Sequence, residues 1–190
     1  MVIGCVCGQR RMALLCLLLC VMQSYRLYDH IINPIRGTNS KICHYCDYEQ
    51  VSLFQYNLLF DNPHVGHMVH WLLDNLEHDI LVFQEVTGEH AQTLQPLHFA
   101  YPYHYQHQDI TVYSRLPLQR INASAHGALL ELIGQTRRDQ TAFHLFAMHS
   151  QAPISHDAWV ERNQLLLEAA RHVAAAPLAY KILLGDLNVP

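Results

Sequence analysis

The chain has 190 residues, of which 51% are hydrophobic and 15% are charged, and its mean hydropathy is +0.01. That length and composition suffice for one hydrophobic core and exclude a largely disordered protein. Residues 49–190 carry seven Lys and Arg against fourteen Asp and Glu, whereas residues 1–48 carry five against two. Because proteins that bind long nucleic acids rely on clustered basic residues, the acidic balance of residues 49–190 argues against a strong nucleic-acid footprint.

Residues 1–24 have the order of a signal or anchor segment. Arg10 and Arg11 precede an unbroken apolar run from Met12 to Met22, which is the charged-then-apolar order of an export signal. The run is shorter than the about 20 residues that a membrane-crossing helix needs, and the small residues of a cleavage site do not follow it. We expect residues 12–22 to be helical, detached from the core and associated with a membrane, with the domain exported to the far side.

Residues 25–48 are expected to be a linker. Their turn-forming residues, such as Pro34 and Gly37, are not accompanied by a periodic apolar pattern. All six cysteines lie within the first 46 residues, so no disulfide framework is expected in the domain that begins at residue 49. Cys43 and Cys46 have the spacing of a zinc or redox pair, but a second ligand pair does not follow at suitable spacing, and we interpret them as part of the linker.

From residue 49 onward, apolar runs typical of strands alternate with helical patterns. Residues 65–76 carry apolar side chains at helical spacing, and residues 80–83 are a continuous apolar run typical of a buried strand. Further helices are predicted at residues 89–94 and 157–175. The predicted strands are residues 51–56, 80–83, 110–113, 128–133, 142–148 and 182–184. This order predicts a layered α/β domain.

Polar groups that can bind metals or phosphate follow several of these strands. Asn57 follows the first strand and Glu85 the second. His149 ends a later strand, and Asp186 and Asn188 follow the last one. A single polar residue in such a place is more often a cap or a solvated side chain. Because ligand sites in α/β folds lie where strands end, we nevertheless expect these five residues to converge at one rim of a sheet.

In order and spacing, these stretches resemble the endonuclease/exonuclease/phosphatase superfamily over residues 49–190. The similar motifs are Tyr56-Asn57-Leu58, the glutamate motif of residues 79–86, the Ser-Arg-x-Pro turn of residues 111–118, Met148-His149-Ser150 and Leu184-Gly185-Asp186-Leu187-Asn188. Residues 101–103 and 159–170 further resemble the bacterial membrane-linked branch called YafD-like. The resemblance implies a four-layer α-β-β-α sandwich.

The resemblance also implies a metal-dependent phosphoesterase that hydrolyses phosphodiester or phosphomonoester bonds. In such an enzyme Glu85 would be the main ligand of Mg²⁺ or Mn²⁺, with Asn57 near it. Asp186 would orient and deprotonate the attacking water, and Asn188 and His149 would hold the phosphate oxygens. The identity of the phosphoester does not follow from the family.

The sequence departs from the family's pattern in two places. The family's carboxy-terminal Ser-Asp-His motif does not appear before Pro190, so the domain is expected to be truncated, incomplete at its carboxy terminus and low in activity or inactive. Asp109 stands where relatives commonly carry Gly, a change expected to disturb a close approach of the backbone. Two rival interpretations stay open: a truncated remnant without enzymatic activity, and a nuclease, against which the acidic balance counts.

Overall fold

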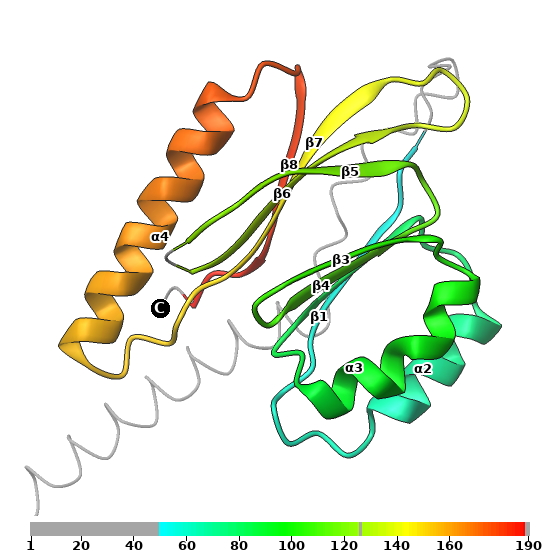
Figure 1. Cartoon of the computed structure of the whole chain (residues 1–190), viewed down its shortest axis with the longest axis horizontal. Coiled ribbons are helices and arrows are strands. Elements are labelled where there is room, and N and C mark those ends of the chain that lie inside the picture. The colour runs from blue at the N-terminus through cyan, green and yellow to red at the C-terminus, as the bar shows by residue number, and fades with distance from the viewer. Residues whose placement is uncertain (1–49, 126, 189–190) are drawn as a thin grey trace, which may run out of the picture. The chain divides into compact units, whose positions relative to one another are not determined.

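The computed structural model describes residues 50–125 and 127–188. The helical elements are α2 (Val65–Asp74), α3 (Gly88–Leu94), the 3₁₀ helix η1 (Gln95–Phe99) and α4 (His156–Ala175). The strands are β1 (Leu53–Asn57), β2 (Ile80–Gln84), β3 (Tyr103–His107), β4 (Ile110–Ser114), β5 (Leu118–Ala123), β6 (Ala128–Gln135), β7 (Ala142–His149) and β8 (Tyr180–Asp186). Figure 1 shows how they are arranged.

The strands form two sheets of four. The first sheet has the order β1-β2-β4-β3 and the second has the order β5-β6-β7-β8. In the first sheet β1 runs parallel to β2, and in the second β7 runs parallel to β8, while the other neighbours are antiparallel. Each sheet therefore contains one parallel pair whose carboxyl ends meet at a common edge.

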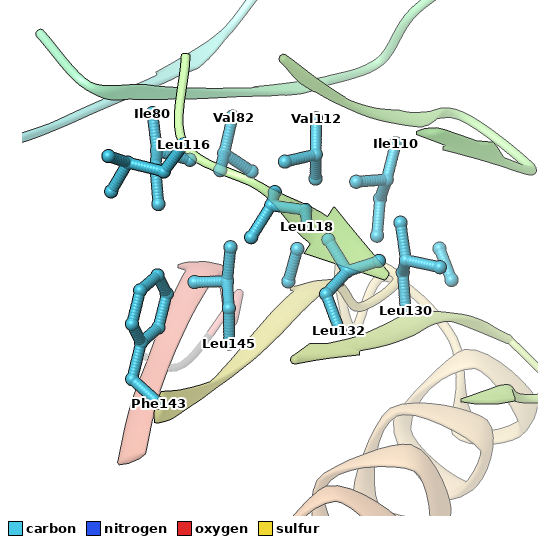
Figure 2. Packing of buried hydrophobic residues seen from close by; sticks show 12 residues of the cluster. Ile80, Val82, Ile110, Val112, Leu116, Leu118, Leu130, Leu132, Phe143 and Leu145 are labelled. Carbon is cyan, nitrogen blue, oxygen red and sulfur yellow. The ribbon is translucent and has the colours of Figure 1, made fainter. Parts of the chain in front are cut away.

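The main core lies between the two sheets. Because side chains alternate across a strand, every second residue of the central strands faces the other sheet. Ile80 and Val82 of β2 and Val112 of β4 lie opposite Leu132 of β6 and Leu145 of β7, as Figure 2 shows. These side chains are buried, and their removal from water is the main force that holds the two sheets together.

Helices cover the outer face of each sheet. Val69 and Leu72 of α2 pack with Phe83 of β2 on the first sheet. On the second sheet, Leu165 and Ala169 of α4 share a cluster with Leu129, Phe146 and Met148. Figure 1 shows α2 and α3 outside one sheet and α4 outside the other. The result is the predicted four-layer α-β-β-α sandwich.

Two strands were not predicted from the sequence. β3 and β5 lie at sheet edges, and most of their side chains are exposed. Only a few residues of these two edge strands, such as Tyr105 and Leu118, pack against the core, so neither strand shows the apolar run or alternation that identifies a strand in a sequence. The Ser-Arg-x-Pro segment, which resembled a strand and turn, contains the end of β4 and the connection to β5.

The predicted signal or anchor run of residues 12–22 and the predicted linker of residues 25–48 lie outside the described residues. Within residues 50–125 and 127–188, no helix is both long enough and apolar enough to span a membrane.

Candidate active site

Four polar side chains lie at the carboxyl ends of the parallel strand pairs. Asn57 ends β1, and Glu85 directly follows β2. His149 ends β7 beside its register partner Asp186, which ends β8. The parallel pairing places each couple at one edge of its sheet, and the packing of the sheets brings the two edges together. The structure brings these four side chains together, but from the edges of two sheets and not from one rim of a single sheet as predicted.

The amide of Asn57 joins the two carboxylates. Its Nδ2 donates to Glu85 Oε1 at 2.8 Å and to Asp186 Oδ2 at 3.0 Å, while its Oδ1 accepts from the backbone N of Leu59 at 2.9 Å. The opposite orientation of the amide would place an acceptor against two acceptors, so the hydrogen bonds determine which way it points. Asn57, predicted as a metal ligand, thus presents its NH₂ group to both acidic side chains.

Each carboxylate oxygen in this pair accepts one hydrogen bond. The second oxygen of Glu85 accepts from the backbone N of Phe60 at 3.1 Å, and Oδ1 of Asp186 accepts from the backbone N of Asn188 at 3.0 Å. A carboxylate oxygen has about two lone-pair positions, so each keeps one for a further partner. Glu85 and Asn188 both have positive φ angles, 58° and 45°, a backbone conformation that typically costs non-glycine residues about 1–3 kcal/mol and is concentrated at functional sites.

His149 is held by a carboxylate that was not predicted to belong to the site. Its Nδ1 lies 2.7 Å from Asp109 Oδ2, and its Nε2 lies 3.9 Å from Glu85 Oε1. Burial by itself lowers the pKa of His149, but the hydrogen bond and charge of Asp109, with the charges of Asp186 and Glu85, outweigh it and raise the pKa above the usual 6.5. The charged imidazolium is therefore favoured beside three acidic groups.

Asp109, in place of the Gly that relatives commonly carry, was expected to disturb a close approach of the backbone, but the described residues keep a backbone hydrogen bond there. Its carbonyl accepts a hydrogen bond from the backbone N of Val86 at 3.0 Å, so the backbones still approach closely. The residue lies in the tight turn between β3 and β4, next to Gln108 with φ 50°. From there its side chain reaches the end of β7. A polar residue in a hairpin turn gives no sequence signal for such a contact.

Gly185 fixes the approach of β8 to β7. Its φ is 142°, and a Cβ atom at this position would lie 1.7 Å from the carbonyl oxygen of Met148. Only glycine tolerates both conditions. This requirement explains the glycine of the Gly-Asp-x-Asn motif, because the close approach sets the position of the next residue, Asp186.

Asn188 is anchored from two sides. Its Nδ2 donates to the carbonyl of Ser150 at 2.6 Å, and its own carbonyl accepts from Arg162 Nη1 at 2.9 Å. Arg162 lies in the middle of α4 and is only 7% exposed. Its sequence position gave a resemblance to one branch of the family but no role in the site. In the structure, its hydrogen bond to the carbonyl of Asn188 connects α4 to the segment after β8.

A cavity of about 790 Å³ opens beside these groups. Glu85, Asp109, His149, Arg162 and Asn188 line it. Its apolar lining includes Phe60 and Ile154, which are 58% and 91% exposed. The cavity therefore combines charged groups with apolar side chains that water reaches.

The donor set fits a divalent cation that prefers oxygen. Glu85, His149 and Asp186 each offer a ligand atom, and these atoms all lie within 4.8 Å of one another. The pKa of His149 is raised by its contact with Asp109, which favours a charged ring and leaves the carboxylate oxygens as the better ligands. Mg²⁺ and Mn²⁺ bind through one or two carboxylates and keep several waters, so the residues present are suitable.

Fold and site together define a four-layer α/β protein with an acidic, histidine-containing cavity at the carboxyl ends of its parallel strands. The chain belongs to the Endonuclease/Exonuclease/phosphatase family, whose sequence profile matches residues 54–190. No curated protein matches the chain in sequence.

Solved structures share this fold. A β-hairpin deletion mutant of beta toxin from Staphylococcus aureus has a TM-score of 0.58 at 15% identity, over 74% of this chain and 68% of its own. TDP2 of D. rerio, complexed with single strand DNA product, has a TM-score of 0.58 at 16% identity, and the match covers 74% of this chain and 61% of that one. Sphingomyelinase C from Streptomyces griseocarneus has a TM-score of 0.54 at 18% identity, and the match covers 75% of this chain and 65% of that one. The chain thus spans 61% to 68% of the length of these three structures.

Proposed function

We propose that the protein is a metal-dependent phosphoesterase that hydrolyses phosphodiester or phosphomonoester bonds. The observation that carries this proposal is the bridge from Glu85 through Asn57 to Asp186, with His149 beside Glu85 and both of these lining one cavity. Membership of the family and a possible metal-ligand triad support it.

Glu85 is the principal ligand of Mg²⁺ or Mn²⁺ in this proposal. Asn57 stabilises the facing carboxylates of Glu85 and Asp186 by donating to both, which keeps them in place before a cation neutralises them. The bound cation would act as a Lewis acid at the phosphoryl group and stabilise the leaving oxygen.

Asp186 is the proposed base. Two donors, Asn57 Nδ2 and the backbone N of Asn188, fix its carboxylate, and each oxygen keeps a lone pair with which to accept a proton from the attacking water. A fixed base loses little entropy in reaching the reactive geometry.

His149 and Asn188 are proposed to hold the phosphate oxygens. Because Asp109 favours the charged form of His149, the imidazolium can donate from Nε2 to an oxygen that gains negative charge in the transition state. Asn188 uses one amide hydrogen on the carbonyl of Ser150, which leaves the second for the phosphate.

The proposed substrate is a class of compound, the phosphoesters, and no individual compound is proposed. A nuclease is the less favoured alternative, because residues 49–190 have a charge balance of −7 and long nucleic acid needs a basic surface. We also propose that residues 12–22 make the protein membrane-associated or exported, in line with the resemblance to the membrane-linked branch. Recovery of the expressed protein in the soluble fraction without detergent would argue against membrane association.

Hydrolysis of bis(p-nitrophenyl) phosphate and p-nitrophenyl phosphate tests the proposal. With Mg²⁺ or Mn²⁺ we expect turnover that EDTA abolishes, and that Asp186→Asn lowers by at least about 10²-fold, the lower end of what a general base contributes. Glu89→Gln is the matched control, since Glu89 is an exposed carboxylate on α3. Turnover that survives EDTA or is unchanged in Asp186→Asn would contradict the proposal.

A further inference from the structure

A second cluster of metal-ligating side chains lies between α4 and the second sheet. Glu131 projects from β6, His144 from β7 and His172 from the last turn of α4. His144 Nδ1 lies 3.4 Å from Glu131 Oε1, and His172 Nδ1 lies 3.2 Å from Glu131 Oε2. One carboxylate thus contacts two imidazoles from two different elements.

The cluster is separate from the candidate active site. His149 shares the parity of Phe143 and Leu145, which face the core between the sheets, whereas His144 shares the parity of Phe146, which faces α4. The two histidines of β7 therefore project from opposite faces of the second sheet.

His144 is the observation that points to a missing ligand. The residue is only 2% exposed, yet neither ring nitrogen has a hydrogen-bond partner among the described residues. Its contact with Glu131 is an approach without hydrogen-bond geometry. Buried polar groups are almost always satisfied, so a ring with two unsatisfied nitrogens beside a carboxylate calls for another partner.

There is room for that partner. A cavity of about 590 Å³ is lined by Glu131, His144 and His172 together with Arg171. An ion can therefore reach all three side chains from solvent.

We propose that Glu131, His144 and His172 form a binding site for a divalent transition metal of the Zn²⁺ class. Two imidazoles and a carboxylate are a ligand set that suits Zn²⁺. Two ligand atoms about 2.05 Å from a tetrahedral ion lie roughly 3.3 Å apart, which matches the distances of 3.4 and 3.2 Å. The imidazoles contact different oxygens of Glu131, and the three residues do not offer ligand atoms that all lie within 4.8 Å of one another. Binding of one ion therefore requires a movement of His172, whose side chain is 28% exposed.

The site would attach α4 to the second sheet. An ion held by β6, β7 and α4 links the outer helix to two strands, and binding that requires the folded arrangement stabilises it. The same helix carries Arg162, whose guanidinium holds the carbonyl of Asn188. Metal at this site therefore stabilises the helix that supports the segment after β8.

Zinc titration of the full chain by calorimetry, with excess Mg²⁺ present to occupy oxygen-rich sites, tests the proposal. Any zinc that the six cysteines bind is the same in every variant, so the test compares the number of ions bound by wild type with the number bound by each variant. We expect wild type to bind one more Zn²⁺ than His172→Ala and Glu131→Gln, with affinity at that site reduced by at least about 100-fold, since loss of an outer partner alone costs roughly 10–100-fold.

His156→Ala, an exposed histidine at the start of the same helix, should keep the extra ion, and His172→Ala should remove one ion from the Glu85→Gln protein as it does from wild type. Zn²⁺ should also raise the melting temperature of wild type more than that of His172→Ala, whose fold is checked by circular dichroism. Equal zinc counts in wild type, His172→Ala and Glu131→Gln would overturn the site and show that the histidines only pair with Glu131. A zinc count that does not fall when His172→Ala is added to Glu85→Gln would overturn its assignment to a second site.

Discussion

The side-chain amide of Asn57 donates to the carboxylate of Asp186 at 3.0 Å, although the two residues are 129 positions apart and end strands of different sheets. This contact ties the edge of the first sheet to the edge of the second. It also keeps two acidic side chains close together, because the same amide group holds Glu85 at 2.8 Å.

Asn57→Ala is therefore expected to impair the site and weaken the fold. Two carboxylates lose a shared donor, and a hydrogen bond to a charged group typically contributes about 1.5–3 kcal/mol. Urea denaturation at pH 7 should show a loss in the free energy of unfolding in that range, and metal-dependent hydrolysis should fall. Asn122→Ala, at an exposed position on β5, is the control. A variant as stable and as active as the control would show that the bridge has no energetic role.

Asp109→Asn is expected to lower the pKa of His149. Asp109 supplies the hydrogen bond and the largest of the charge effects that raise this pKa against the effect of burial. NMR titration of the imidazole in metal-free protein measures it directly. Asp74→Asn, an exposed carboxylate at the end of α2, should leave the pKa unchanged. If both variants titrate like wild type, Asp109 does not control the charge of His149.

The same pair gives stability a defined pH dependence. A histidine whose folded pKa is raised stabilises the fold while protonated, so its contribution is fully present below the unfolded value of about 6.5 and is lost as the pH rises through the folded pKa. In metal-free wild type the free energy of unfolding should fall over this window, and in Asp109→Asn this loss should be smaller.

Gly185→Ala is expected to disrupt the end of β8. A methyl group here meets the carbonyl of Met148, and the φ of 142° disfavours any side chain. Strain and overpacking together cost at least about 3 kcal/mol. Gly88→Ala is the matched control, because nothing lies within 4 Å of its Cβ position, and its effect should stay within about 1 kcal/mol. Thermal unfolding followed by circular dichroism compares them, and equal melting temperatures would contradict the close approach.

The sequence predicted the parts of the fold that burial dictates. β2 and β4 are buried along their whole length, so their apolar runs were visible. β3 and β5 lie at edges with exposed side chains, and no such pattern exists for them. α3 has seven residues, about two turns, and was predicted at residues 89–94.

In the site, the residues at strand ends could be predicted from the sequence, whereas the residues that hold them in place could not. Glu85, His149 and Asp186 follow or end strands whose apolar runs are visible in the sequence, so one rule about strand ends predicts their convergence. Asp109 lies in a hairpin turn and Arg162 in the middle of a helix. Their contacts with His149 and Asn188 depend on how separate elements pack, which local patterns do not encode.

The most direct test of the central claim is binding of Mn²⁺ followed by electron paramagnetic resonance. In wild type we expect a bound Mn²⁺ that Mg²⁺ displaces, and in Glu85→Gln an affinity at least about tenfold lower, because one charged oxygen ligand is replaced by a neutral amide. Glu89→Gln, altered at an exposed carboxylate on α3, should bind like wild type. Equal Mn²⁺ affinity in wild type and Glu85→Gln would contradict the proposal that Glu85 holds a catalytic metal.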